Sequence, residues 1–231
     1  MKKADALAKH GVIYTSGSFG NYEVCKNYDE LVCRIKRGKK LRQMICEYIH
    51  PNRTIIMYFD LDGEEDDPTV LEKLKGAILK LFDEEFIEVR FIVLTSHKPP
   101  DKYSYHLFVR FFHKKEHKEW AFKNVEELKT FLDFHKLLTL GSQKMKIDPV
   151  VYRDGLFRTV FSDKVSKDGT FSSERRPFIF DESQSYTTDV KYTLIQYFDE
   201  EPITPFYELM FESSDCTSSE SEAFDSVVLS I

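Results

Sequence analysis

An apolar run that ends in two alternating aspartates, "IIMYFDLD" at residues 55–62, constrains the fold more than any other stretch of this chain. Alternate side chains of a strand share a face, so Asp60 and Asp62 point one way while Phe59 and Leu61 point into the core. Two carboxylates on one face repel each other, and removing them from water is costly unless a cation compensates. The pattern therefore predicts either a divalent-metal site or a strand that ends in a solvated acidic loop.

The length and the cysteines limit the class of protein. The chain has 231 residues, enough to bury a substantial core in one large domain or two small ones. Its four cysteines are scattered without a CxxC pair, which predicts reduced thiols and neither a disulfide framework nor a zinc site. No apolar run approaches the roughly 20 residues that span a bilayer, and the basic N-terminus lacks the apolar core of a signal peptide. We therefore expect an intracellular protein with no membrane contact.

Charge is distributed unevenly along the chain. From Tyr192 onward there are nine acidic residues and no lysine or arginine, whereas the rest has 33 basic and 30 acidic residues. A mildly basic body with an acidic tail is compatible with nucleic-acid binding. The basic cluster "RIKRGKKLR" at 34–42 predicts a solvated helix face, a polynucleotide contact or a nuclear import signal. The Ser- and acid-rich segment 212–227 is typical of disorder, and the tail either solubilises the protein or docks onto a basic partner.

Helix and strand patterns are intermixed, and several strands follow one another directly, which indicates an α+β fold. Residues 52–62, 87–96 and 103–112 have strand patterns. Helices are predicted from Pro68 onward, with Asp67 as N-cap, and over 124–138, with Asn124 as N-cap. Residues 146–153 and 156–162 are predicted as paired strands, followed by an Asp-Gly hairpin turn at 168–169 and a short helix over 188–198.

Two further motifs place polar side chains at strand positions. In "KYSYH" at 102–106, the period of two puts Ser104 and His106 on one face, near Lys102. A hydroxyl, an imidazole and an ammonium group would suit binding of a polyphosphate. A half-exposed strand with a polar outer face would have the same sequence pattern. The segment "IDPVVYRDGLFRTVFSDK" has a carboxylate followed by spaced cations, which suits either a third metal ligand beside phosphate clamps or ordinary solvent-facing charges. Its charged residues of interest are Asp148, Arg153, Arg158 and Lys164.

Taken together, "YFDLD", "KYSYHLFVRF" and "IDPVVYRDGLFRTVFSDK" resemble the three catalytic motifs of the archaeo-eukaryotic primase (AEP) superfamily. The resemblance is to its PrimPol branch, which includes the primases of herpesviruses, poxviruses and other large DNA viruses, and it covers about residues 45–180. It implies a template-dependent nucleotidyltransferase, a DNA primase or primase-polymerase, on an α+β core. In that core an N-terminal α/β layer packs on an RRM-like module, with the site between them. We expect the catalytic core over residues 1–200 and the acidic tail over 201–231.

The resemblance also implies roles for individual residues. Asp60, Asp62 and Asp148 would hold two divalent ions, Mg²⁺ or Mn²⁺, and His106 would join them as a catalytic residue. The incoming triphosphate would be held by Lys102, Ser104, His106, Arg158, Lys164 and, with a looser match, Arg153. Eukaryotic members of the family often have Glu where Asp62 stands. The zinc module of many relatives, which is associated with starting primers, has no counterpart here, so we expect no zinc, and de novo priming is in question.

The implied partners are a single-stranded DNA template, an NTP or dNTP, and a replicative helicase or single-strand-binding protein. The implied location is the nucleus or a cytoplasmic replication site.

Other readings of the same residues stay open. "FDLDG" also resembles the nucleophile motif of haloacid-dehalogenase-type phosphatases, and "FIVLTS" supplies a strand that ends in Thr95 and Ser96, as their second motif does. The chain would alternatively be a catalytically degenerate primase that serves as a DNA-binding replication subunit. "HKKEH" at 113–117 fits the inverted zincin pattern, but it directly follows a strand, so we expect a lysine-rich loop.

Overall fold

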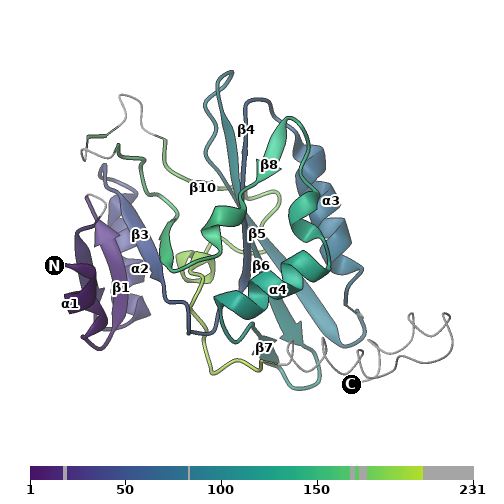
Figure 1. The fold of residues 1–231 in the computed structure, drawn as a ribbon, viewed down its shortest axis with the longest axis horizontal. Helices are drawn as coiled ribbons and strands as arrows, with labels where there is room; N and C mark the ends of the chain where they lie inside the picture. Colours follow the sequence, from purple (N-terminus) through teal and green to yellow (C-terminus); the bar gives the residue numbers. More distant parts are fainter. Residues whose placement is uncertain (18–19, 83, 167–169, 172–175, 205–231) are drawn as a thin grey trace, which may run out of the picture.

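The computed structural model describes residues 1–17, 20–82, 84–166, 170–171 and 176–204 (Figure 1). The helices in these residues are α1 (Lys3–Leu7), α2 (Tyr28–Gly38), α3 (Pro68–Leu79) and α4 (Val125–Phe134), with 3₁₀ turns η1 (Leu137–Thr139), η2 (Pro149–Val151) and η3 (Val190–Thr193). The strands are β1 (Val12–Ser16), β2 (Tyr22–Cys25), β3 (Ile45–Ile49), β4 (Met57–Gly63), β5 (Ile87–Thr95), β6 (Tyr103–His113), β7 (Lys118–Trp120), β8 (Met145–Ile147), β9 (Gly155–Arg158) and β10 (Ile179–Phe180). The mixture of helices with antiparallel sheets confirms the α+β class.

The strands form two sheets. The first has the order β2-β1-β3-β9 and lies with α1 and α2 at the left of Figure 1. The second has the order β10-β5-β6-β4-β8, with β7 paired to β6. Apart from the short strand β7, the elements β4, α3, β5, β6, α4 and β8 follow one another along the chain as β-α-β-β-α-β, and neighbouring strands in the sheet are antiparallel. This is the split β-α-β arrangement, which puts β4 and β6 side by side at the centre of the sheet.

Each face of the second sheet has a different covering. Phe59 lies opposite Leu107 in the β4–β6 register, and both side chains are fully buried. Phe82, which follows α3, packs against Phe111 of β6 and Phe131 of α4, so both helices cover this face. The other face presents Tyr58, Asp60 and Asp62 of β4, and it is covered by the segments that follow β8 and β9. Strand alternation in β4 therefore separates core residues from candidate site residues, as the sequence predicts.

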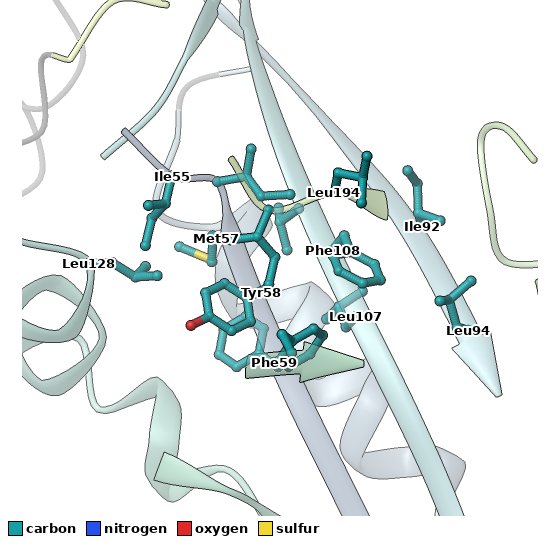
Figure 2. Packing of buried hydrophobic residues seen from close by; sticks show 14 of the residues in the cluster. Ile55, Met57, Tyr58, Phe59, Ile92, Leu94, Leu107, Phe108, Leu128 and Leu194 are labelled. Carbon is teal, nitrogen blue, oxygen red and sulfur yellow. The ribbon is translucent and has the colours of Figure 1, made fainter. Parts of the chain in front are cut away.

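The hydrophobic core is continuous between the two sheets. Tyr14 and Ile45 of the first sheet belong to the same buried cluster as Phe59 and Phe108 of the second. Figure 2 shows part of this cluster, with side chains of β4, β5 and β6 packed together and joined by Leu128 of α4 and by Leu194. Full burial of each large apolar side chain contributes about 1.5–3 kcal/mol, so the two sheets stabilise each other.

Several sequence predictions need correction. Residues 146–153 and 156–162 are not paired strands: β8 pairs with β4, β9 pairs with β3, and Asp148 precedes a 3₁₀ turn because Pro149 lacks a backbone N–H for a ladder. The predicted helix over 188–198 is only the short turn η3. The helix predicted over 124–138 is confirmed with Asn124 as its cap, but it ends at Phe134 and is followed by the turn η1. Asp67 makes no capping bond to α3 and accepts from the Thr69 and Ser142 hydroxyls instead.

Two predicted segments lie outside the part of the chain that the structure describes. Residues 168–169 of the expected hairpin turn and the acidic segment 212–227 lie outside the described residues. The N-terminal strands β1, β2 and β3 were not predicted from the sequence, because short strands without strict alternation resemble loops. Within the described ranges, no helix has both the length and the apolar character required to cross a bilayer.

Candidate active site

The three predicted acidic residues come together at one end of the second sheet. Asp60 and Asp62 lie on β4, and the β4–β8 pairing places Leu61 opposite Ile147. The next residue, Asp148, donates its backbone N–H to the carbonyl oxygen of Asp60 at 2.9 Å. Residues 88 positions apart thus become neighbours because β8 pairs antiparallel with the second half of β4.

The second motif lies directly across the β4–β6 ladder from these acids. His106 is the cross-strand partner of Asp60, and Ser104 is the partner of Asp62. The Nε2 atom of His106 lies 3.6 Å from Oδ1 of Asp60. The Ser104 hydroxyl donates to Asp62, and Lys102 Nζ donates to Asp62 Oδ2 at 2.6 Å. The predicted shared face of Ser104 and His106 is confirmed, and it is the face on which the aspartates lie.

These residues open onto a cavity of about 280 Å³ between the two sheets. One wall carries the residues of β4 and β6 just described. Another wall comes from β3, β9 and the segment after β9, and it includes Met44, Cys46, Phe157 and Phe178. Three cations complete the lining: Arg158 at the end of β9, Lys164, and Arg176. The cavity therefore has an acidic end and a cationic end with an apolar wall beside them.

Burial and like charge act strongly on the acidic end. Burial, together with the nearby carboxylates of Asp62 and Asp148, raises the pKa of Asp60 to about 7, although the positive charge of Arg158 opposes the shift. A carboxyl group in this position gains most from a cation placed close to it. The electrostatics of Asp60 therefore favour cation binding at this edge of the sheet.

At the cationic end of the cavity, burial and neighbouring positive charges lower the pKa values of three basic groups. Burial, followed by the positive charges of Lys102 and Arg158, lowers the pKa of Lys164. Burial lowers the pKa of the Arg158 guanidinium, and burial together with Arg158 holds the pKa of His106 well below its ordinary value. Like charges crowd this end of the cavity, which is the electrostatic condition of an anion site.

Three buried nitrogens at the cavity have no hydrogen-bond partner among the described residues. They are Nδ1 of His106, Nη1 of Arg158 and Nε of Arg176. The His106 ring stacks on Phe178 at 3.5 Å between centroids, and the Arg158 guanidinium lies over the same ring at 4.3 Å. Buried polar atoms normally find partners, and an external ligand with acceptor oxygens would satisfy these three nitrogens.

The fit of the acidic end to a divalent cation is partial. Hard cations such as Mg²⁺ and Mn²⁺ take carboxylate oxygens, and Asp60, Asp62 and Asp148 supply that chemistry. The Asp148 carboxylate, however, accepts from the Val150 backbone N–H at 2.8 Å, and Asp62 is engaged by Lys102 and Ser104. Over the described part of the chain, no three His, Cys, Asp or Glu side chains are grouped closely enough to hold a metal. Cation binding would require Asp148 to turn and Lys102 to leave Asp62.

The structure brings together all but one of the predicted site residues. Arg153 is exposed and lies in a separate hollow of about 230 Å³ at the start of α4, beside Asn52 and Asn124, so it does not reach the cavity of Asp60. Arg176, Phe157 and Phe178 line the cavity and were not predicted. Their segments have no motif or periodicity that separates them from other loops, so the signal that identifies them is tertiary.

The residues of the phosphatase-like motif and of the inverted zincin pattern make other contacts. Thr95 is opposite Tyr105, on the sheet face away from Asp60, and the Ser96 hydroxyl donates to the Arg176 carbonyl. His113 ends β6 and accepts from the Glu116 backbone N–H, and residues 114–117 form a turn, as expected for a loop.

A comparison of this sequence with models of known protein families and with curated proteins finds no match.

Proposed function

We propose that this protein is a template-dependent nucleotidyltransferase, a DNA primase or primase-polymerase that adds nucleotides along single-stranded DNA. One observation carries the proposal: a single cavity is lined by Asp60 and Asp62, with Asp148 beside Asp60, and by the side chains of His106, Arg158 and Arg176, each of which has a buried nitrogen without a partner among the described residues. A nucleoside triphosphate with bound cations has the complementary charges. The three sequence motifs meet at this cavity, which supports the resemblance to the AEP superfamily.

The proposal includes the finer architecture of that superfamily. The β-α-β-β-α-β order of β4 to β8 supports an RRM-like module, and β1, β2, β3 and α2 would belong to the N-terminal α/β layer. The cavity between the two sheets would then be the catalytic cleft. In this arrangement β4 and β6 form the rigid floor on which the acidic and phosphate-binding groups are held.

The residues have distinct tasks in the proposed reaction. Asp60, Asp62 and Asp148 would hold two divalent ions, Mg²⁺ or Mn²⁺, which would supply charge neutralisation and activation of the attacking hydroxyl. Arg158, Lys164 and Arg176 bind phosphate oxygens and stabilise the negative charge of the departing pyrophosphate. Neutral His106 offers a nitrogen to a phosphate oxygen without adding charge. Lys102 and Ser104 hold Asp62 in the free protein and turn to the phosphates when nucleotide binds.

The test is incorporation of labelled nucleotide on a primed and an unprimed single-stranded template, with NTPs or dNTPs, in Mg²⁺ or Mn²⁺. We expect Asp60→Asn to abolish incorporation, because it removes one anionic ligand without changing side-chain volume. In metal-free buffer near pH 8 the same variant should be at least as stable to heat as the wild type, because ionising the wild-type Asp60 opposes folding. Full incorporation by Asp60→Asn would refute the assignment.

The two alternative functions, a phosphatase and a degenerate DNA-binding subunit, predict different results in simple assays. Release of phosphate from small phosphoesters without a template would favour the phosphatase. A degenerate DNA-binding subunit would show no metal-dependent nucleotide binding by calorimetry. The unfavourable burial of Asp60 and the unpartnered Nη1 of Arg158 argue against a degenerate site, because neutral side chains at both positions would be more stable in a protein without a ligand there.

A further inference from the structure

The basic cluster at the end of α2 is not explained by the catalytic residues. Residues 34–42 carry six lysines and arginines and no acid. The side chains of Arg37, Lys39, Lys40 and Arg42 are exposed. So many like charges on one short exposed segment create a strong local positive potential, which attracts polyanions.

The loop that carries these charges is held in place and leads to the catalytic cavity. The Gln43 side chain donates to the Arg34 carbonyl at 3.1 Å and packs so closely on Gly38 that a Cβ there would lie 1.7 Å from its Nε2. The next residue, Met44, lines the cavity. Gln43 therefore holds the loop of residues 39–42 against α2, and the chain passes from this loop directly to the cavity wall at Met44.

A buried carboxylate joins the cluster to the cationic end of the cavity. Asp163 lines the cavity, and its Oδ2 lies 3.5 Å from Nε of Arg42. Its Oδ1 accepts from the Arg176 backbone N–H at 3.1 Å. Asp163 therefore connects the segment of Arg176 in the cavity to Arg42 in the α2 loop, and its charge offsets part of the charge of Arg42.

Aromatic rings are interleaved with these cations. Lys39 Nζ lies 5.2 Å from the ring centre of half-buried Phe161, and the Arg42 guanidinium lies 5.0 Å from that of Phe171. Phe161 has φ of 61°, a left-handed conformation that is costly for an aromatic residue and is usually retained at functional sites. Alternating cations and aromatic rings are the features of surfaces that bind unpaired nucleic-acid strands.

We infer that these six residues, Arg37, Lys39, Lys40, Arg42, Phe161 and Phe171, form a basic-aromatic strip that binds a single-stranded polynucleotide leading out of the cavity. The cations contact backbone phosphates, and the rings offer faces to unpaired bases. The biological meaning of the strip rests on the proposed function, since a template or primer must leave the catalytic cavity along some surface. Its binding, however, needs neither nucleotide nor metal.

The test compares two charge-neutralised proteins. The strip variant is Arg37→Gln, Lys39→Gln, Lys40→Gln, and the control is Lys114→Gln, Lys115→Gln, Lys118→Gln at the exposed β6–β7 turn, with the same loss of charge. Binding of a fluorescent thymidine oligonucleotide is measured by anisotropy in EDTA at several salt concentrations. The strip variant should bind at least about 10-fold more weakly at low salt, with a salt slope smaller by about 2, whereas the control should keep the wild-type slope. Equal losses in both variants would overturn the inference.

A second variant tests the aromatic part of the strip. Phe161→Leu keeps apolar volume but removes the ring face, so we expect a loss of about 5-fold or more with an unchanged salt slope. Duplex DNA should bind more weakly than the single strand and should not respond to Phe161→Leu, because its bases are already stacked. Equally tight duplex binding would contradict the inference. A parallel titration with a uridine oligonucleotide decides whether the strip prefers DNA or RNA, and a thermal melt verifies that each variant folds.

The binding and incorporation assays distinguish an error in the proposed strip from an error in the proposed function. Binding that depends on the strip in a protein without nucleotide incorporation would support the strip and refute the polymerase. Incorporation by the strip variant with an unchanged KM for template would refute the strip and leave the polymerase intact.

Discussion

At the scale of single residues, His106 is the clearest example of a group whose environment points to a ligand. Its side chain is buried, it stacks between Phe157 and Phe178, and its Nδ1 has no partner among the described residues. Because burial keeps its pKa well below the ordinary value, the imidazole is neutral throughout the physiological range. It therefore acts as a positioned hydrogen-bonding group and not as a titrating acid.

This assignment predicts a separation of kinetic constants. His106→Gln should raise the KM for nucleotide about 10- to 100-fold, since a hydrogen bond to a charged group contributes about 1.5–3 kcal/mol. The kcat should change little, and the wild-type KM should have no step between about pH 6 and 8 that the variant lacks. Steady-state incorporation on a primed template measures both constants, with His10→Gln, an exposed site, as control. A large fall in kcat with unchanged KM would assign His106 to the chemical step.

At the scale of elements, the segment 190–197 is held to the second sheet by a fully buried arginine. Arg110 of β6 pairs with Glu119 of β7 at 2.6 Å. Its guanidinium also donates to the carbonyl oxygens of Tyr192, Leu194 and Tyr197 at 3.0–3.1 Å. One side chain thus satisfies backbone groups of a segment that has little regular structure. The attachment depends on a complete set of hydrogen bonds, because a buried charge without partners is strongly destabilising.

We therefore expect Arg110→Met to lower the free energy of unfolding by about 3–5 kcal/mol, because it leaves Glu119 and three carbonyls without their donor. Arg90→Met is the matched control on the neighbouring strand, where the Arg90–Glu88 pair is more than one-third exposed and should contribute less than about 1 kcal/mol. Urea unfolding of the two variants gives both values. Similar losses in the two proteins would show that segment 190–197 is not anchored through Arg110.

At the scale of the whole molecule, a buried carboxylate joins the two sheets through the same segment. Glu47 of β3 accepts from the backbone N–H groups of Ile195 at 2.7 Å and Gln196 at 3.1 Å. Burial raises its pKa to about 7 despite these hydrogen bonds. A carboxyl whose folded pKa exceeds its unfolded value contributes stability at low pH, and that contribution is lost as the pH rises toward the folded pKa.

The stability of the wild type should therefore fall relative to Glu47→Gln as the pH rises from about 5 to 8, by at most about 3 kcal/mol. The glutamine variant keeps the volume but cannot ionise, so its own curve should lack this component. Urea unfolding at several pH values without metal gives the difference, and Glu88→Gln, at an exposed position, is the control. A difference between wild type and Glu47→Gln that stays constant with pH would contradict the expected ionisation of Glu47.

The sequence by itself determined the elements and groups whose signals are local. Alternation in "IIMYFDLD" correctly put Phe59 and Asp60 on opposite faces, with Phe59 in the core, and the spacing in "KYSYH" correctly put Ser104 and His106 on one face, because a strand has a period of two. Only the tertiary structure decided that Asp148 joins Asp60 through the β4–β8 pairing, that β8 and β9 belong to different sheets, and that Arg153 lies away from the cavity. It also added Arg176 to the cationic end. Local periodicity is encoded within a few residues, whereas strand order and loop placement depend on contacts between distant segments that compete for the same core.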